Sequence, residues 1–320
     1  MLMVSVCVAA YNQERYIGQT LDGIIRQKTA FPIEILVNDD CSTDGTADIL
    51  RDYQRKYPET VKPLYQETNQ YSKGVGIDPT FNYPRAQGKY IALCEGDDLW
   101  TDENKLQRQV DSMEEHPGCT FAMTNATIRD AAGLRPERPF LPYREKDKNL
   151  CFDKDRRFDL GEMCGVNFAP TASFLFPKAV LERIPPEMWK RPCPHGDLKL
   201  RMFCTAAGYG VYQHERTCVY RENVIQGTMS KWAKEDSARA FERAKSVAAM
   251  LRDVDEFSKK RYTEQVNRFR DWYLYVMLWN GPATRVLDDP ELLRVYRAQP
   301  PGKRARFRLK RLARRLTRRP

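Results

Sequence analysis

Short apolar segments alternate with amphipathic segments through the first 125 residues of the chain. The apolar segments are nearly continuous, which is typical of parallel strands buried on both faces, and the others carry apolar side chains at helical spacing. We expect strands at residues 3–9, 33–37, 61–65, 90–93 and 120–125, and helices at residues 14–27, 46–56 and 101–116. This alternation predicts an α/β fold, a doubly wound, mostly parallel sheet with helices on both faces.

Two pairs of adjacent carboxylates follow strands of this expected sheet. Asp39 and Asp40 follow the second strand, and Asp97 and Asp98 follow the fourth. The carboxyl ends of parallel strands meet at one rim, where ligands bind in open α/β sheets. Like charges repel unless a cation lies between them, and Mg²⁺ binds one or two carboxylates together with substrate phosphates. We therefore predict that Asp98 holds a cation that holds a diphosphate. The alternative is an acidic turn that caps the next helix.

The second half of the chain has a different pattern. Residues 126–160 are polar, charged and rich in Pro, which predicts a long loop. Residues 229–280 show helical periodicity and predict a two-helix appendage, which could also mediate self-association. We expect a catalytic domain at residues 1–225, with a nucleotide-sugar half at 1–125 and an acceptor half at 126–225. A helical appendage at 226–300 and a tail at 301–320 follow.

Charge separates the tail from the rest of the chain. The 320 residues carry a net charge of +10, yet Lys303 to Pro320 alone contain ten Lys and Arg and no acid. The remaining 43 basic residues balance the 43 acidic ones, so the body gives no general case for nucleic-acid binding. Apolar residues recur in the tail at helical spacing, at Ala305, Leu309, Leu312, Ala313 and Leu316. This pattern predicts a basic amphipathic helix on a membrane surface. The alternatives are a disordered basic tail and a nucleic-acid contact.

Other sequence features bound the class of protein. No apolar run approaches the ~18 residues of a membrane span, and the N-terminal segment has no positively charged start of an export signal. The nine cysteines form no CxxC pair, which disfavours a zinc site and favours a reducing, cytoplasmic setting. The first strand–helix junction lacks GxGxxG, so a dinucleotide-binding enzyme is disfavoured.

Three segments carry a family resemblance. They are residues 4–12 (VSVCVAAYN), 33–46 (IEILVNDDCSTDGT) and 88–98 (GKYIALCEGDD). In order and spacing they closely resemble family 2 glycosyltransferases of the GT-A fold, over roughly the first 125 residues. The family usually has Gly where this chain has Cys41. The resemblance implies bacterial surface-polysaccharide assembly as the setting.

The resemblance implies roles for residues at the donor site. Ala9 and Tyr11 of the first loop would bind the donor, with Tyr11 stacked on the base, and Asp40 would accept the imide N–H of that base. Asp97 would lie near the ribose, and Asp98 would ligate Mn²⁺ or Mg²⁺. Two structural alternatives remain: Tyr11 as a packing aromatic residue, and Asp40 as the cap of the following helix.

Two basic residues are further donor-site candidates. Lys73 lies in a polar loop that could reach the phosphates, and Arg221 lies in segments 219–223 and 227–230, which resemble a loop closing over the site. The alternatives are an exposed loop lysine and an ordinary surface arginine. Trp232 lacks the preceding Arg of the QxxRW motif, so a processive polymerase is not expected.

Asp197 is the predicted general base. Its segment, PHGD, resembles the Glu-Asp or Gly-Asp motif of the family, whose Asp takes the proton of the attacking hydroxyl. Glu162 is a weaker rival, and the alternative role of Asp197 is a helix N-cap. The resemblance places Thr171 and Ser173 beside the acceptor, and His195 is expected to shape that pocket.

Together these features predict an inverting, metal-dependent glycosyltransferase. It would move one sugar from a nucleotide donor, UDP-linked by expectation, to a glycan or lipid-linked glycan. We expect it in the cytoplasm, peripheral at the inner face of the cell membrane, without nucleic acid as a partner. One alternative is a catalytically silent nucleotide-sugar-binding module, and another is a nucleic-acid-binding protein acting through its tail.

Overall fold

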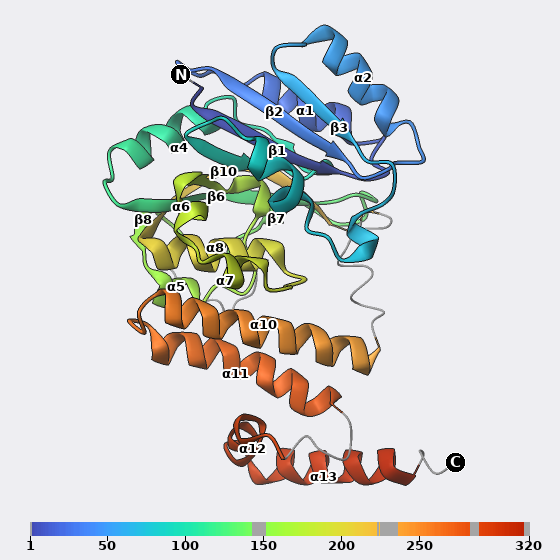
Figure 1. Cartoon of the computed structure of the whole chain (residues 1–320), viewed down its shortest axis with the longest axis vertical. Coiled ribbons are helices and arrows are strands. Elements are labelled where there is room, and N and C mark those ends of the chain that lie inside the picture. The colour runs from blue at the N-terminus through green and yellow to red at the C-terminus, as the bar shows by residue number, and fades with distance from the viewer. Residues whose placement is uncertain (1, 143–151, 223, 225–235, 282–287, 317–320) are drawn as a thin grey trace. The chain divides into compact units, whose positions relative to one another are not determined.

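The computed structural model describes residues 2–142, 152–222, 224, 236–281 and 288–316, and only the backbone of the last four of these (Figure 1). The chain forms two compact units. The first contains residues 1–185 and 196–225, and the second contains residues 186–195 and 226–320.

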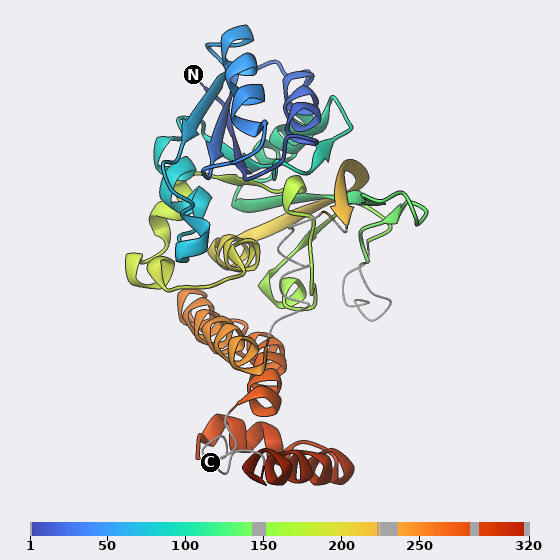
Figure 2. The ribbon, with the colours of Figure 1, turned by 90° about the vertical axis from the view of Figure 1, so that its right-hand side faces the viewer.

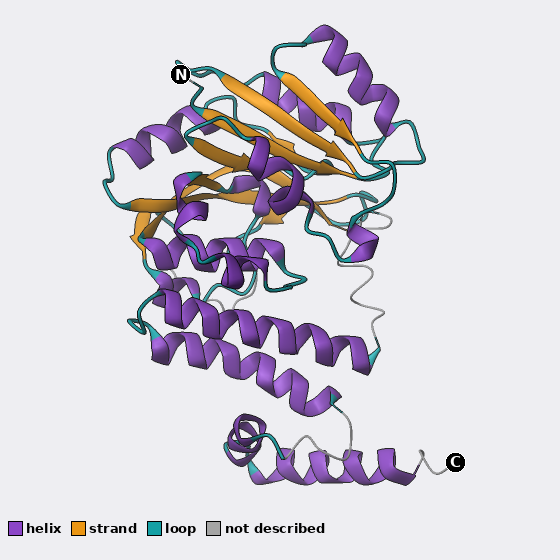
Figure 3. Ribbon diagram, in the orientation of Figure 1, coloured by secondary structure: helices purple, strands orange, loops and turns teal. Residues whose placement is uncertain are grey.

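A mixed sheet forms the centre of the first unit (Figure 3). Its strand order is β3-β2-β1-β4-β9-β6-β10-β5, with β7 beside β6 and β8 beside β10. The strands are β1 Val4–Ala10, β2 Ile33–Asp39, β3 Val61–Tyr65, β4 Tyr90–Leu93, β5 Leu99–Trp100, β6 Cys119–Asp130, β7 Arg138–Pro139, β8 Arg156–Phe158, β9 Leu175–Pro177 and β10 Tyr209–Glu222.

The first four strands of this order are parallel, as predicted. Strand β9 then runs antiparallel to both of its neighbours, β4 and β6, and β10 runs parallel to β6. The parallel strands are nearly continuous apolar runs because both faces are covered: Val4, Val6 and Val8 of β1 are all fully buried.

Helices flank the sheet on either side (Figure 2). The α-helices of this unit are α1 Ile17–Ile25, α2 Thr46–Lys56, α3 Tyr83–Arg85, α4 Lys105–Glu114, α5 Leu160–Met163, α6 Ala179–Arg183 and α8 Gly196–Ala207. Short 3₁₀ turns occur at η1 Tyr71–Lys73 and η3 Thr171–Ser173, and a π-helical turn at η2 Asp78–Asn82.

The prediction of one long loop at residues 126–160 is wrong in part. Strand β6 continues to Asp130 because residues 126–130 pair with β10, and β7 and β8 lie within the same stretch. The polar side chains in this segment interrupt the apolar run, so the sequence pattern did not predict the end of β6. Alternate residues, Ala126, Ile128 and Asp130, are nevertheless buried.

The second unit is helical, in agreement with the predicted C-terminal helices. Its helices are α7 Pro186–Lys190, α10 Ser237–Phe257, α11 Thr263–Asn280, α12 Pro290–Arg297 and α13 Pro301–Leu316. Helices α10, α11, α12 and α13 share a core that includes Ala248, Leu274, Leu278, Val295 and Phe307. Among the described residues, no helix is both long and apolar enough to cross a bilayer.

Polar contacts explain why residues 186–195 belong to the second unit. The guanidinium of Arg191 pairs with Asp253 of α10, with Nη2 3.1 Å from Oδ1. Nη1 of Arg243 lies 3.2 Å from Nε2 of His195.

A buried carboxylate joins the first strands of the sheet. Glu34 of β2 is 1% exposed, and its oxygens accept hydrogen bonds from Ser5 Oγ at 2.7 Å, Lys62 Nζ at 2.8 Å and the Gln87 amide at 2.9 Å. Burial acts to raise the pKa of Glu34, but these hydrogen bonds outweigh it and hold the pKa below its ordinary value of 4.5.

We predict that Glu34→Gln destabilises the protein at neutral pH and much less in acid. A carboxylate whose pKa is lowered in the folded state adds stability above pH 4.5, and this is lost as the pH falls through the folded pKa. Urea unfolding at pH 7 should show a loss of ~1–3 kcal/mol, which shrinks as the pH falls below 4.5. Glu59→Gln, at an exposed position, is the control. An equal loss at pH 7 and in acid would contradict the assignment.

Candidate functional site

Three loops meet at the carboxyl ends of β1, β2 and β4. The Asp40 amide donates to Ala10 O at 2.9 Å, and the Gly96 amide donates to Ala9 O at 3.0 Å. A Cβ on Gly96 would lie 2.1 Å from Oε1 of Gln13, whose side chain can move, and 3.2 Å from the backbone oxygen of Ala9, so the loop packs closely against β1 here. The two acidic pairs therefore reach one rim of the sheet, as the strand pattern predicts.

Side chains lock the first two loops together. The Asn12 amide donates to Ser42 Oγ at 2.9 Å, and the Thr43 amide donates to Asn12 Oδ1 at 2.8 Å. Asn12 has a left-handed backbone with φ 52°, which asparagine tolerates better than most residues. Next to it, Tyr11 is 36% exposed, so its ring is not part of the buried core and is accessible to a ligand.

Asp40 and Asp44 have different tasks. Asp40 is 2% exposed, and its oxygens accept hydrogen bonds from the amides of Gln70 at 2.7 Å and Tyr71 at 3.0 Å. It therefore holds the loop after β3 and does not cap α2. Asp44 lies at the start of that helix and accepts a hydrogen bond from the Thr46 amide at 3.0 Å.

The second acidic pair combines burial with an unsatisfied oxygen. Asp97 is half-buried and Asp98 is 2% exposed. Oδ1 of Asp98 accepts a hydrogen bond from the Arg221 amide at 3.4 Å, whereas the buried Oδ2 has no hydrogen-bond partner. Burial, followed by the charge of Asp97, raises the pKa of Asp98 well above its ordinary value. The carboxylate form is thus stable only with a positive charge beside it.

Arg221, near the end of β10, supplies part of that charge. Its guanidinium donates to Asp97 O and, at 2.6 Å, to Gln19 Oε1, and it lies 4.9 Å from the Tyr16 ring centroid. Arg221 is 7% exposed, so the alternative of a surface arginine is wrong. Burial lowers its pKa, although Asp98 and Asp97 act in the opposite direction. Sequence analysis found the residue but missed this contact.

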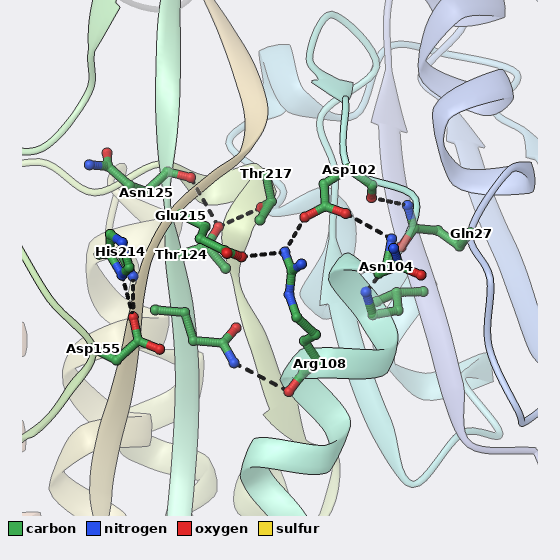
Figure 4. Close-up of polar contacts among 12 residues, drawn as sticks. Gln27, Asp102, Asn104, Arg108, Thr124, Asn125, Asp155, His214, Glu215 and Thr217 are labelled. Atoms are coloured by element: carbon green, nitrogen blue, oxygen red, sulfur yellow. Dashed lines mark hydrogen bonds and ion pairs between the residues drawn. The ribbon is translucent and has the colours of Figure 1, made fainter.

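Further hydrogen bonds fix the acidic loop, which we define as residues 94–98 between β4 and β5. Thr20 Oγ1 donates to Gly96 O at 3.0 Å and to Asp98 O at 2.6 Å. Beyond β5, Asp102 pairs with Arg108, which also contacts Glu215 at 2.7 Å (Figure 4). The loop is therefore held by α1, α4 and β10 together.

A buried lysine, which sequence analysis missed, lies beneath β5. Nζ of Lys105 is 4.0 Å from the centroid of the Trp100 ring and donates to Gln109 Oε1 at 2.8 Å. Burial lowers the pKa of Lys105 to about 8. Trp100 Nε1 donates to Ala172 O and Gln109 Nε2 donates to Ser173 O, each at 2.8 Å. These two hydrogen bonds connect β5 and α4 to η3.

The residues of the acidic loop are compatible with a cation that a bound diphosphate also contacts. Oδ2 of Asp98 is a buried acceptor without a partner, which a hard cation would satisfy. Within the described ranges, no group of three or more His, Cys, Asp or Glu side chains could hold a metal. One or two carboxylates plus phosphates are the usual ligands of Mg²⁺, so a bound diphosphate would have to complete the site.

Asp197 is the second residue of α8 and is half-buried. It therefore lies in the first turn of α8. Although Glu95 is exposed, desolvation by the surrounding loops, followed by the charges of Asp98, Asp97 and Asp197, raises the pKa of Glu95. The charge of Asp197 therefore reaches Glu95 of the acidic loop.

Glu162, the rival candidate for the general base, has a structural role. Glu162 forms a capping box with Asp159: its amide donates to Asp159 Oδ1 at 2.9 Å, and its side chain accepts from the Asp159 amide at 3.1 Å. The same carboxylate pairs with Arg156. These contacts occupy Glu162 at the start of α5.

The other predicted site residues differ in accessibility. Lys73 is exposed and donates to Thr68 Oγ1 at 2.6 Å, and Thr171 is half-buried. Ser173 is fully buried and its hydroxyl donates to Pro170 O at 2.7 Å, which is the arrangement of a structural residue. His195 is half-buried and belongs to the second unit. Residues 227–230 of the expected closing loop lie outside the described residues.

Comparison with known proteins identifies the family. The model of glycosyl transferase family 2 matches residues 5–175, more than half of the chain, so the chain belongs to this family. Over 144 residues it is 42% identical to the uncharacterized protein Rv1520 of Mycobacterium tuberculosis, a match that covers 44% of this chain and 40% of that one. Over 151 residues it is 36% identical to TuaG of Bacillus subtilis, a putative teichuronic acid biosynthesis glycosyltransferase, covering 47% of this chain and 56% of TuaG. The chain thus spans about half the length of these relatives.

Solved structures confirm the GT-A fold. The structure of Staphylococcus aureus TarS 1–349 with UDP aligns with a TM-score of 0.57 and 16% identity, over 98% of this chain and 88% of that chain. The mannosyltransferase PcManGT of Pyrobaculum calidifontis, with GDP-Man and Mn²⁺, aligns with a TM-score of 0.55 and 16% identity, over 96% of this chain and 79% of that chain.

The second loop offers a test of backbone strain. Cys41 has φ 63°, a left-handed conformation that costs a non-glycine residue ~1–2 kcal/mol. Glycine, which the family resemblance leads us to expect at this position, would avoid this cost. We predict that Cys41→Gly melts at or above the temperature of the wild type, whereas Cys41→Val melts lower because a β-branched residue is strained there. Cys41→Ser controls for loss of the thiol. Equal melting of the Gly and Val variants would contradict this explanation.

Proposed function

We propose that this chain is an inverting, metal-dependent glycosyltransferase that moves a single hexosyl-type sugar from a nucleotide donor to a glycan or lipid-linked glycan. The observation that carries the proposal is the buried Asp98, with its unsatisfied oxygen, beside Asp97 and the loop held by Asp40. Family membership and a likeness to bacterial cell-wall transferases support this reaction class.

The donor would lie across the rim of the sheet. Tyr11 is exposed for stacking on the base, and Asp40 keeps lone pairs for its imide N–H beside the amides that it already binds. Asp97 would lie at the ribose, with the Ala9 backbone at the base of the loop. Arg221 donates to the backbone carbonyl of Asp97 and would thereby position its carboxylate. Lys73 is exposed and is the candidate for contact with the phosphates. A UDP-sugar is our proposed donor, supported by the printed complexes of TarS with UDP and UDP-GlcNAc.

Asp98 would hold Mn²⁺ or Mg²⁺ between the protein and the donor. When bound, such an ion stabilises the negative charge that develops on the leaving diphosphate. The mannosyltransferase neighbour was solved with Mn²⁺, which supports a divalent cation in this fold. Asp98 itself contributes a buried acceptor oxygen that no described protein group satisfies.

Asp197 would take the proton of the attacking hydroxyl. Inversion requires this base to lie opposite the leaving group, so that the acceptor attacks in line. Thr171 is the proposed acceptor contact, and Ser173 is not retained because it is buried. His195, which belongs to the second unit, stays a prediction from the sequence. We propose a setting at the cytoplasmic face of the membrane in bacterial surface-polysaccharide synthesis.

Asp197→Asn provides the direct test. We expect sugar transfer to fall ~10²–10⁴-fold, because the amide cannot accept the proton, while donor binding is preserved. The assay measures nucleoside diphosphate released from UDP- and GDP-sugars with a bacterial lipid-linked glycan extract as acceptor, and calorimetry measures donor binding.

Asp48→Asn is the matched control, because it removes an exposed first-turn carboxylate from another helix. It should leave transfer unchanged. Unchanged transfer in Asp197→Asn would contradict the assignment of the base. Donor binding without transfer by the wild-type protein would instead support the silent binding module.

A further inference from the structure

Helix α13 packs against the other helices of the second unit through its basic face. Phe307 is 3% exposed, and its ring centroid lies 5.8 Å from that of Trp279 and 5.4 Å from that of Tyr296. Arg308 Nε donates to the Tyr296 hydroxyl at 2.8 Å. Phe307 is thus the anchor that joins α13 to the helical core.

Cationic side chains surround this anchor and lie over aromatic rings. Nζ of Lys303 is 5.6 Å from the centroid of Tyr275, and Nζ of Lys310 is 5.3 Å from that of Trp279. Such placements are favourable cation–π contacts, and the aliphatic stems of the lysines cover apolar surface. The inner face of α13 is therefore made of cations on aromatic rings.

The apolar stripe of α13 lies on the opposite face. Ala305, Leu309 and Leu312 follow one another at helical spacing, about half a turn away from Phe307 around the helix axis. All three are exposed, Leu309 by 66% and Leu312 by 56%. An amphipathic helix of a soluble domain normally turns its apolar stripe toward the core. In α13 the stripe faces away from the core that the helix contacts.

We propose that this outward stripe of α13 docks onto an anionic lipid surface. Lys303 to Pro320 contain ten Lys and Arg and no acid, and Arg306 and Arg308, which lie on either side of the helix between Phe307 and the stripe, are exposed. These cations would contact anionic headgroups, and the exposed leucines would enter the boundary of the acyl chains. Charge argues against a second copy as the occupant, because pairing two such stripes would bring two strongly cationic segments together. Nucleic acid would engage the cations but would leave the leucines in water.

Binding to vesicles tests the proposal with the full chain, and it does not rest on the proposed reaction. Flotation would compare vesicles of phosphatidylcholine with vesicles that also contain phosphatidylglycerol. The wild type should bind the anionic vesicles, and added salt should weaken binding. The double variant Leu309→Gln/Leu312→Gln should bind at least ~10-fold more weakly, although its charge is unchanged.

Leu134→Gln is the matched control, since Leu134 is 84% exposed in the first unit. It should bind vesicles like the wild type. Because Leu309 and Leu312 are exposed, the double variant should keep the wild-type melting temperature, and circular dichroism checks this.

Three outcomes would overturn the proposal. The first is a folded double variant that binds anionic vesicles as well as the wild type. The second is a lipid-free dimer that the double variant loses, which would make a second copy the occupant. The third is wild-type binding to duplex DNA but not to anionic vesicles, which would assign the tail to nucleic acid.

Discussion

The candidate site depends on the electrostatics of one buried carboxylate. Asp98 is removed from water beside Asp97, and one of its oxygens has no hydrogen-bond partner. Repulsion and desolvation oppose its ionised form, and Arg221, bound to the Asp97 carbonyl, offsets only part of this cost. Thr20 and the pairing of Arg108 with Asp102 hold the loop in place. In the function we propose, a bound cation supplies the remaining positive charge.

Much of the fold could be predicted because buried parallel strands are continuous apolar runs. Strands β3 and β4 begin and end at the predicted residues, Val61–Tyr65 and Tyr90–Leu93. The rim on which the acidic pairs meet follows from strand direction alone. The family motifs then suggested which of these acids have a chemical task, because spacing alone cannot separate a ligand from a helix cap.

The parts that could not be predicted depend on contacts between distant residues. The Arg221 amide reaches an Asp98 oxygen across 123 positions of sequence, and Asp40 holds amides 30 and 31 positions away rather than the adjacent helix. Strand β6 is longer than its apolar run because β10 pairs with its polar end. For α13, periodicity gave the stripe, but only the contacts of Phe307 show which face points away from the core.

The most direct test of this account measures whether nucleotide binding needs both a divalent cation and Asp98. Thermal unfolding would be followed with UDP, GDP and other nucleotides, each with and without Mn²⁺, for the wild type, Asp98→Asn and the distant control Asp48→Asn. A ligand at 100 times its Kd adds ~2.7 kcal/mol of stability, which is readily seen. The account predicts that Mn²⁺ and one nucleoside diphosphate together stabilise the wild type and the control but not Asp98→Asn. Stabilisation of Asp98→Asn equal to that of the wild type would contradict it.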